Sequence, residues 1–201
     1  RDVERSRGLG DVYKRQGNIY FIDLDKLVDE GLLEKEEILE YNWGTDESEI
    51  DYAALHQNRC KILQKAFERF DTNAQEFQDF VKKQSEWLEQ YALFMTLKTD
   101  NLYKNWSEWP SEYRNTQTVA LEKYQKRNYN TITFWKFCQY KFFEQWEDLK
   151  NYANSKGIYI IGDISFYVGY DSVDVWAERQ LFMMSANDTP CLLYTSPSPR
   201  D

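Results

Sequence analysis

The sequence predicts an α/β chain that is mostly helical and ends in a short strand. Apolar residues recur with helical periodicity from Asp51 to about residue 154. Gly157 then interrupts the pattern, and the run "IYIIGD" (158–163) follows, short, apolar and rich in β-branched residues. A run of this kind is typical of a strand covered on both faces, and a helix, a tight turn and such a strand form half of a βαβ unit.

The two ends of the chain differ from the rest. Residues 6–16 ("SRGLGDVYKRQ") back-translate to a DNA whose reverse complement, read one base in, encodes residues 191–201 ("CLLYTSPSPRD"). We therefore expect residues 1–16 and 191–201 to be translated transposon-end sequencing adaptor and not part of a domain, with the gene continuing on both sides. The remaining residues, 17–190, have the length of one domain.

Residues 17–190 are strongly acidic. The whole chain has 25 Lys+Arg and 34 Asp+Glu, and the two ends hold six and four of these, which leaves 19 and 30 and a net charge of −11. Sequence-independent binding to nucleic acid needs Lys and Arg to displace counterions, and anionic membranes also attract basic segments. Neither nucleic acid nor a membrane is therefore expected as a partner. No apolar run approaches the roughly 20 residues of a membrane helix, and a cytoplasmic location is expected.

The cysteines and the single histidine predict no metal site. Cys60 and Cys138 each lie in an amphipathic run, and two cysteines at this spacing form neither a disulfide framework nor a zinc pattern. Buried, reduced thiols are expected. His56 lies on a predicted helix beside its apolar face, without a second His or Cys nearby, so neither a metal nor a catalytic role is expected for it.

The first part of the chain predicts a strand and then short helices. Residues 17–25, "GNIYFIDLD", are typical of a short strand or extended segment that leads into a polar stop. Residues 26–40, "KLVDEGLLEKEEILE", predict a short helix, a break at Gly31 and an acidic turn. An irregular acidic loop is expected over residues 41–51.

Three helices are predicted after Asp51, where apolar side chains begin to recur at steps of three and four residues. Thr72 with Gln75 is a capping-box pattern, which predicts the start of the second helix. Ser85 is expected to cap the third helix. The segment "NWSEWP" (105–110) ends in proline and predicts a loop.

The longest helical tract covers residues 116–154, with an expected break near "RNYNT" (127–131). Aromatic residues line one face of these helices, and a stripe at helical spacing indicates core packing. The loop residues Trp106, Trp109 and Trp176 are instead candidates for stacking against a sugar ring.

Asp163 stands where the apolar run "IYIIG" ends. If this run is a parallel barrel strand, Asp163 lies at its C-terminal end, the face on which (β/α)8 barrels build their active sites. The alternative is that Asp163 caps a turn or the next helix. Spacing alone leaves both interpretations open.

Five segments together resemble the 4-α-glucanotransferase family, also called amylomaltase or disproportionating enzyme. The most specific is "KGIYIIGDISFYVGYDSVDVWAERQLF" (156–182). The others follow the family's order along the chain: "GNIYFIDLDKLVDEGLL" (17–33), "WLEQYALFMTLK" (87–98), "NWSEWP" (105–110) and "FWKFCQYKFFEQWEDLKNYANSKGI" (134–158).

The resemblance implies a piece of a (β/α)8 TIM barrel that carries an inserted α-helical subdomain. It assigns residues 17–50 to a barrel-associated segment and residues 51–130 to the inserted subdomain. Residues 131–190 would then contain a helix, a barrel strand and an active-site loop. The two strands are expected near residues 18–23 and 158–163.

The resemblance also implies an activity: transfer of α-1,4-glucan segments between malto-oligosaccharides, to a glucose or glucan acceptor, by a retaining double displacement. The nucleophilic Asp and the acid/base Glu are expected downstream of this sequence, so no catalytic residue is assigned within it. No metal and no organic cofactor is implied.

Four residues are implied at the substrate. Asp163 is expected to bind a sugar hydroxyl or to orient the catalytic carboxylates, and Asp171, Ser172 and Trp176 match the following loop. These three residues are expected either to contact the sugar or to support the loop. The alternative function is a non-catalytic helical module that binds carbohydrate or a partner, which the many helices and the loop tryptophans suggest.

Overall fold

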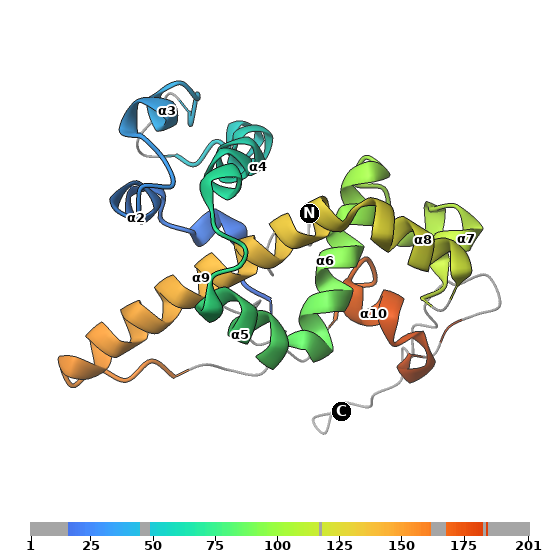
Figure 1. Ribbon diagram of the computed structural model, residues 1–201. Helices are drawn as coiled ribbons and strands as arrows, with labels where there is room; N and C mark the ends of the chain where they lie inside the picture. The colour runs from blue at the N-terminus through green and yellow to red at the C-terminus, as the bar shows by residue number, and fades with distance from the viewer. Residues whose placement is uncertain (1–15, 45–48, 117, 162–167, 183, 185–201) are drawn as a thin grey trace, which may run out of the picture.

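The computed structural model describes residues 16–44, 49–116, 118–161, 168–182 and 184, which form helices and connecting loops (Figure 1). The elements are, in chain order, η1 (Ile19–Phe21), α2 (Leu24–Asp29), α3 (Lys35–Leu39), α4 (Tyr52–Arg69), α5 (Gln75–Lys83), α6 (Ser85–Asp100), η2 (Trp106–Glu108), α7 (Ser111–Arg114), α8 (Val119–Arg127), α9 (Tyr129–Ser155), α10 (Val173–Ala177) and η3 (Arg179–Leu181). Over these described ranges no strand is assigned, apart from a single bridge residue at Met184.

The 27-residue helix α9 is the axis around which the other helices are arranged. Helices α4, α5, α6 and α8 pack against it, and its C-terminal end extends beyond them (Figure 1). In the part of the chain that the structure describes, no helix is both long enough and apolar enough to cross a membrane.

Aromatic side chains fill the space between α4, α5 and α9. The Phe67 ring lies 5.7 Å from that of Phe134 and 5.5 Å from that of Phe137, centroid to centroid. Phe70 meets Phe77 edge-on at 5.3 Å. Tilted and edge-on arrangements are those that aromatic pairs favour. The predicted role of the helical aromatic stripe, core packing, is confirmed.

The predicted strand over residues 18–23 is wrong, because this segment forms η1 and then enters α2. The Asn18 side chain caps η1, and Arg59 of α4 donates to the carbonyls of Ile19 and Ile22. Backbone groups that are already hydrogen-bonded to side chains are not available to a strand ladder. Contacts with a distant helix therefore override the local pattern.

The apolar segment after α9 does not form the predicted covered strand in its described part. Residues 158–161 have no assigned secondary structure, and residues 162 and 163 lie outside the described residues. Ile158 is 60% exposed and Ile161 is 91% exposed. A strand exists only where a neighbouring strand pairs with it, and the described residues supply no such neighbour.

Local signals fix several helix ends as predicted. The Asp51 side chain accepts a backbone hydrogen bond at the start of α4. Gly31 and Gly157 have φ angles of +73° and +75°, the left-handed conformation in which glycine commonly ends helices. Helices α8 and α9 meet at Asn128, inside the expected break.

Two predicted caps are absent, although the helices that they were meant to start are present. Helix α5 has Ala74 at its N-cap, and the Gln75 side chain donates to Asp79 at 2.9 Å and not to a cap residue. Thr72 therefore forms no capping box with Gln75. Ser85 is the first residue of α6 and makes no cap bond, because a single residue joins α5 to α6.

Cys60 and Cys138 are free thiols, as predicted. Cys138 is completely buried and Cys60 is partly buried. Burial raises the pKa of both thiols, which keeps them protonated at neutral pH.

Candidate functional site

The candidate site is the loop that follows the Gly-Asp dipeptide. Asp163 itself lies outside the described residues, so its placement stays a prediction. Asp171, Ser172 and Trp176 lie within residues 168–182, together with α10 and η3. This segment lies beside α6 in Figure 1 and contacts it.

The Asp171 carboxylate faces the helical part of the chain. One of its oxygens pairs with the ammonium of Lys98, in the last turn of α6, and the other accepts the backbone N–H of Trp106 at 3.3 Å. The side chain of Asp171 is 36% exposed, whereas that of Lys98 is only 11% exposed. Asp171 therefore ties the loop to α6 and η2.

Ser172 shapes the loop from within. It is the N-cap of α10, and its Oγ accepts the backbone N–H of Val175 at 3.4 Å. Serine is a preferred N-cap residue because its side-chain oxygen satisfies an N–H group that the helix itself leaves free. The hydroxyl therefore sets where α10 begins.

The three loop tryptophans are buried. The exposed fraction is 0% for Trp106, 2% for Trp109 and 1% for Trp176. Trp176 packs against Trp109 and Phe94, and its indole N–H donates to the carbonyl of Tyr113 at 3.0 Å. The described chain uses these rings for packing, and each ring is almost completely covered.

Sequence reasoning did not single out Lys98 or give Trp106 its role in this loop. The indole N–H of Trp106 donates to the carbonyl of Tyr170 at 2.8 Å, and the Arg179 guanidinium lies 4.6 Å from the Trp106 ring. A cation over an aromatic face is attracted by the ring's electrons. Lys98 and Trp106 belong to two of the segments that resemble the family, residues 87–98 and 105–110. That resemblance was the signal available for finding them.

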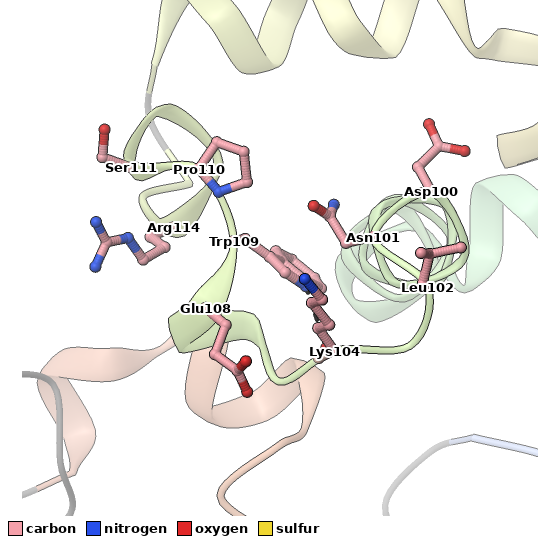
Figure 2. Close-up of a pocket in the computed structure, with 9 residues that line it drawn as sticks. All are labelled: Asp100, Asn101, Leu102, Lys104, Glu108, Trp109, Pro110, Ser111 and Arg114. Atoms are coloured by element: carbon pink, nitrogen blue, oxygen red, sulfur yellow. Dashed lines mark hydrogen bonds between the residues drawn. The ribbon is translucent and has the colours of Figure 1, made fainter.

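A cavity of about 540 Å³ lies between the C-terminal end of α6 and the segment that contains η2 and α7 (Figure 2). It is lined by Asp100, Asn101, Leu102, Lys104, Glu108, Trp109, Pro110, Ser111 and Arg114. In Figure 2, Asn101 and Trp109 point toward its centre, while Glu108 and Arg114 lie on the α7 side.

Charges balance among the residues that line this cavity, with Asp100 and Glu108 against Lys104 and Arg114. The Asp100 carboxylate accepts the Tyr124 hydroxyl at 2.5 Å, and burial together with this carboxylate raises the pKa of Tyr124. A site of this kind offers both donors and acceptors without a net charge. Neutral hydroxyl groups are a suitable ligand for it.

A second cavity, of about 280 Å³, is bounded by residues 17–20 and by α4, α6 and α9. Trp135 is one of its lining residues, and the indole N–H of Trp135 is the only buried side-chain polar atom without a hydrogen-bond partner among the described residues. Bound water is a common partner for such an atom. His56 borders this cavity, and no group of three or more His, Cys, Asp or Glu in the described ranges could hold a metal ion.

Comparison with known proteins identifies the family. A family model described as 4-alpha-glucanotransferase matches residues 12–190. The 4-alpha-glucanotransferase of Clostridium butyricum is 39% identical over 170 residues, which are 84% of this chain and 35% of the relative. That of Streptococcus pneumoniae serotype 4 is 40% identical over 176 residues, 85% of this chain and 34% of the relative. The chain therefore spans about a third of the length of these curated relatives.

A solved structure agrees with the sequence matches. The amylomaltase from Streptococcus agalactiae in complex with acarbose superposes with a TM-score of 0.80 at 34% identity, over 87% of this chain and 36% of that chain. The predicted fold class, a piece of a (β/α)8 barrel with inserted helices, is confirmed by this match. Taken together, the family model, the relatives and the shared fold show that the chain belongs to the 4-alpha-glucanotransferase family.

Proposed function

We propose that the protein to which this chain belongs transfers α-1,4-glucan segments between malto-oligosaccharides. The observation that carries this proposal is the family match over residues 12–190. The acarbose complex of the Streptococcus agalactiae amylomaltase supports an oligosaccharide as the ligand. The alternative, a non-catalytic helical binding module, has no comparable support.

The proposed chemistry is a retaining double displacement. A carboxylate attacks the anomeric carbon while a carboxylic acid, about 5–5.5 Å away, protonates the leaving oxygen. A sugar hydroxyl then takes the place of water in the second step, so the site has to hold the acceptor and exclude water. We propose that the nucleophilic Asp and the acid/base Glu lie C-terminal to this sequence.

Within this chain, Asp163 is proposed to bind a sugar hydroxyl or to orient the two catalytic carboxylates. Asp171, Ser172 and Trp176 are proposed to contribute to substrate binding by holding the loop beside Asp163. The contacts of Asp171 with Lys98, the cap bond of Ser172 and the burial of Trp176 support this role. No cofactor is assigned to the reaction, and a cytoplasmic location without nucleic acid or membrane as a partner is proposed.

The full-length enzyme with Asp163→Asn tests the site. The substitution keeps the shape of the side chain and removes its charge, so kcat/KM for maltotriose should fall on the order of 100-fold if this carboxylate acts at the reacting sugar. Asp29→Asn, at the exposed last residue of α2, serves as the matched control and should retain activity. Equal kcat/KM for the two variants would contradict the role of Asp163.

A further inference from the structure

Lys98 holds the loop at residues 168–177 to the end of α6. Its ammonium pairs with Asp171 and also donates to the carbonyl of Lys104 at 2.9 Å. The ring of Phe94 lies 5.9 Å from the same ammonium. A charge this far from water is costly to leave unpaired, so these contacts fix the side chain in one place.

Trp106 approaches the same stretch of loop from η2. Its backbone N–H donates to Asp171 at 3.3 Å, and its indole N–H donates to the carbonyl of Tyr170 at 2.8 Å. Two consecutive loop residues are therefore held by one ammonium and two N–H groups, all of them from the helices and loops between residues 98 and 106. The helical part of the chain thus determines how the loop lies.

We propose that Lys98 is a positioning residue for glucan transfer, which acts through Asp171 to hold the substrate loop in its active orientation. The inference rests on the proposed glucanotransferase function. We assign Lys98 itself no contact with the sugar. Its position in the last turn of α6 suits a cation, because the carbonyl end of a helix attracts positive charge.

Helix α10 has an anchoring hydrogen bond of its own. Trp176 is buried against Trp109 and Phe94, and its indole N–H donates to the carbonyl of Tyr113 at 3.0 Å, a bond that does not involve Lys98. Loss of the ammonium should therefore loosen residues 168–172 while α10 stays packed. The expected defect is in substrate handling, with the fold retained.

Lys98 also connects the loop to the cavity in Figure 2. The carbonyl of Lys104 accepts both the Lys98 ammonium at 2.9 Å and the indole N–H of Trp109 at 3.2 Å. Lys104 and Trp109 both line that cavity. One side chain therefore fixes the loop and the adjoining wall of the cavity together.

Kinetics of the full-length enzyme test the proposal. Lys98→Met keeps the length of the side chain and removes its charge, and kcat/KM for maltotriose should fall on the order of 10- to 100-fold because small misplacements of bound substrate are costly. Asp171→Asn should cause a similar loss. The double variant should lose no more than the worse single variant, because the two residues act as one unit. Lys98→Arg should recover part of the activity, and Lys126→Met, on the exposed face of α8, should be unaffected.

Amide hydrogen exchange gives a second reading that does not depend on activity. In Lys98→Met, exchange over residues 168–172 should accelerate on the order of tenfold, while exchange in α9 stays unchanged. Unchanged exchange, or losses of kcat/KM that add in the double variant, would overturn the proposal. If Lys98→Met does not fold, Asp171→Asn decides by the same two readings, since it preserves the shape of the side chain. A wild-type enzyme that forms no transfer products would contradict the proposed function, whereas the exchange measurement would still decide the role of Lys98.

Discussion

Two glutamines on α9 hold both ends of the segment at residues 17–23. The Gln139 amide bonds to the backbone N–H and carbonyl of Gly17 at 2.7 and 2.9 Å, and the Gln145 amide bonds to the same two groups of Asp23 at 2.7 and 3.1 Å. Each amide thus pairs with the chain as a neighbouring strand would. A side chain at Gly17 would place its Cβ 2.0 Å from the Phe142 ring, which explains the glycine.

Replacing Gln139 with leucine should destabilise the fold. The substitution leaves a buried N–H and a buried carbonyl of Gly17 without partners, at a cost of about 1–3 kcal/mol for each group. Gln125→Leu, on the exposed face of α8, should change the free energy of unfolding by no more than about 0.5 kcal/mol. Urea denaturation of the two variants measures the difference in their free energies of unfolding. Equal unfolding midpoints would contradict a stabilising role for the hydrogen bonds between Gln139 and Gly17.

Glu37 and Arg69 join α3 to α4 by a pH-dependent contact. The hydrogen bonds from the Arg69 guanidinium, one of them 2.9 Å long, lower the pKa of Glu37 from its usual 4.5 to about 2, with help from the backbone N–H of Glu34. Because the pKa is lowered on folding, the pair contributes its full stability above about pH 4.5. That contribution is lost as the pH falls toward 2.

An NMR titration of the Glu37 carboxyl group tests whether its pKa is lowered in the folded chain. The wild-type chain should titrate near pH 2, and Arg69→Met should bring the midpoint back toward 4.5. Lys61→Met, on an exposed position of α4, is the control and should leave the titration unchanged. A wild-type midpoint near 4.5 would show that the Arg69 contact does not form in solution.

At the scale of elements, the end of α9 depends on one glycine. Gly157 has a φ of +75°, and an added Cβ would meet no atom within 4 Å, so any cost of substitution comes from the backbone alone. Gly157→Ala should therefore destabilise the chain by about 1 kcal/mol. Gly169→Ala, which also has open space around it and no left-handed φ, should have little effect. Thermal melts compare the stabilities of the two variants. Equal melting temperatures would show that the left-handed conformation of Gly157 does not require glycine.

Helix ends were predictable where one residue decides them. Asp51, Gly31 and Gly157 act through their own hydrogen bond or φ angle, so the sequence window around each contains the cause. Residues 18–23 are different, because the partner that turns them away from a strand, Arg59, lies about 40 residues later in the chain. The local hydrophobic pattern contains no information about a contact between residues so far apart in the sequence.

The same distinction applies to the candidate site. Asp171, Ser172 and Trp176 could be singled out because they lie in one continuous segment that resembles the family. Their partners could not, since Lys98 is 73 residues from Asp171 and pairs with it only in the folded chain. Sequence reasoning therefore found the loop and missed what holds it.

At the scale of the whole molecule, apolar surface remains open around the end of α9. A groove of about 800 Å³ runs along its C-terminal half, lined by Phe21, Leu149 and Tyr152 among others, and the segment at residues 158–161 is exposed beyond it. The chain covers about a third of the length of its relatives. We propose that the part of the protein that lies outside this sequence covers this surface.

The isolated 201-residue chain should therefore self-associate, because exposed apolar segments with unpaired backbone groups template pairing between copies. Ile161→Lys should reduce this association in the isolated chain and lower the stability of the full-length enzyme. Sedimentation velocity measures the first effect and thermal melting the second. A monodisperse monomer of the unmodified chain would show that residues 158–161 do not promote self-association.

Product analysis of the full-length protein incubated with maltotriose tests the proposed glucan transfer most directly. A glucanotransferase that retains configuration should release glucose and form longer malto-oligosaccharides whose new linkages are all α, seen by chromatography and by the anomeric proton signals. Products that are only shorter than the substrate, or new linkages of β configuration, would contradict retaining glucan transfer.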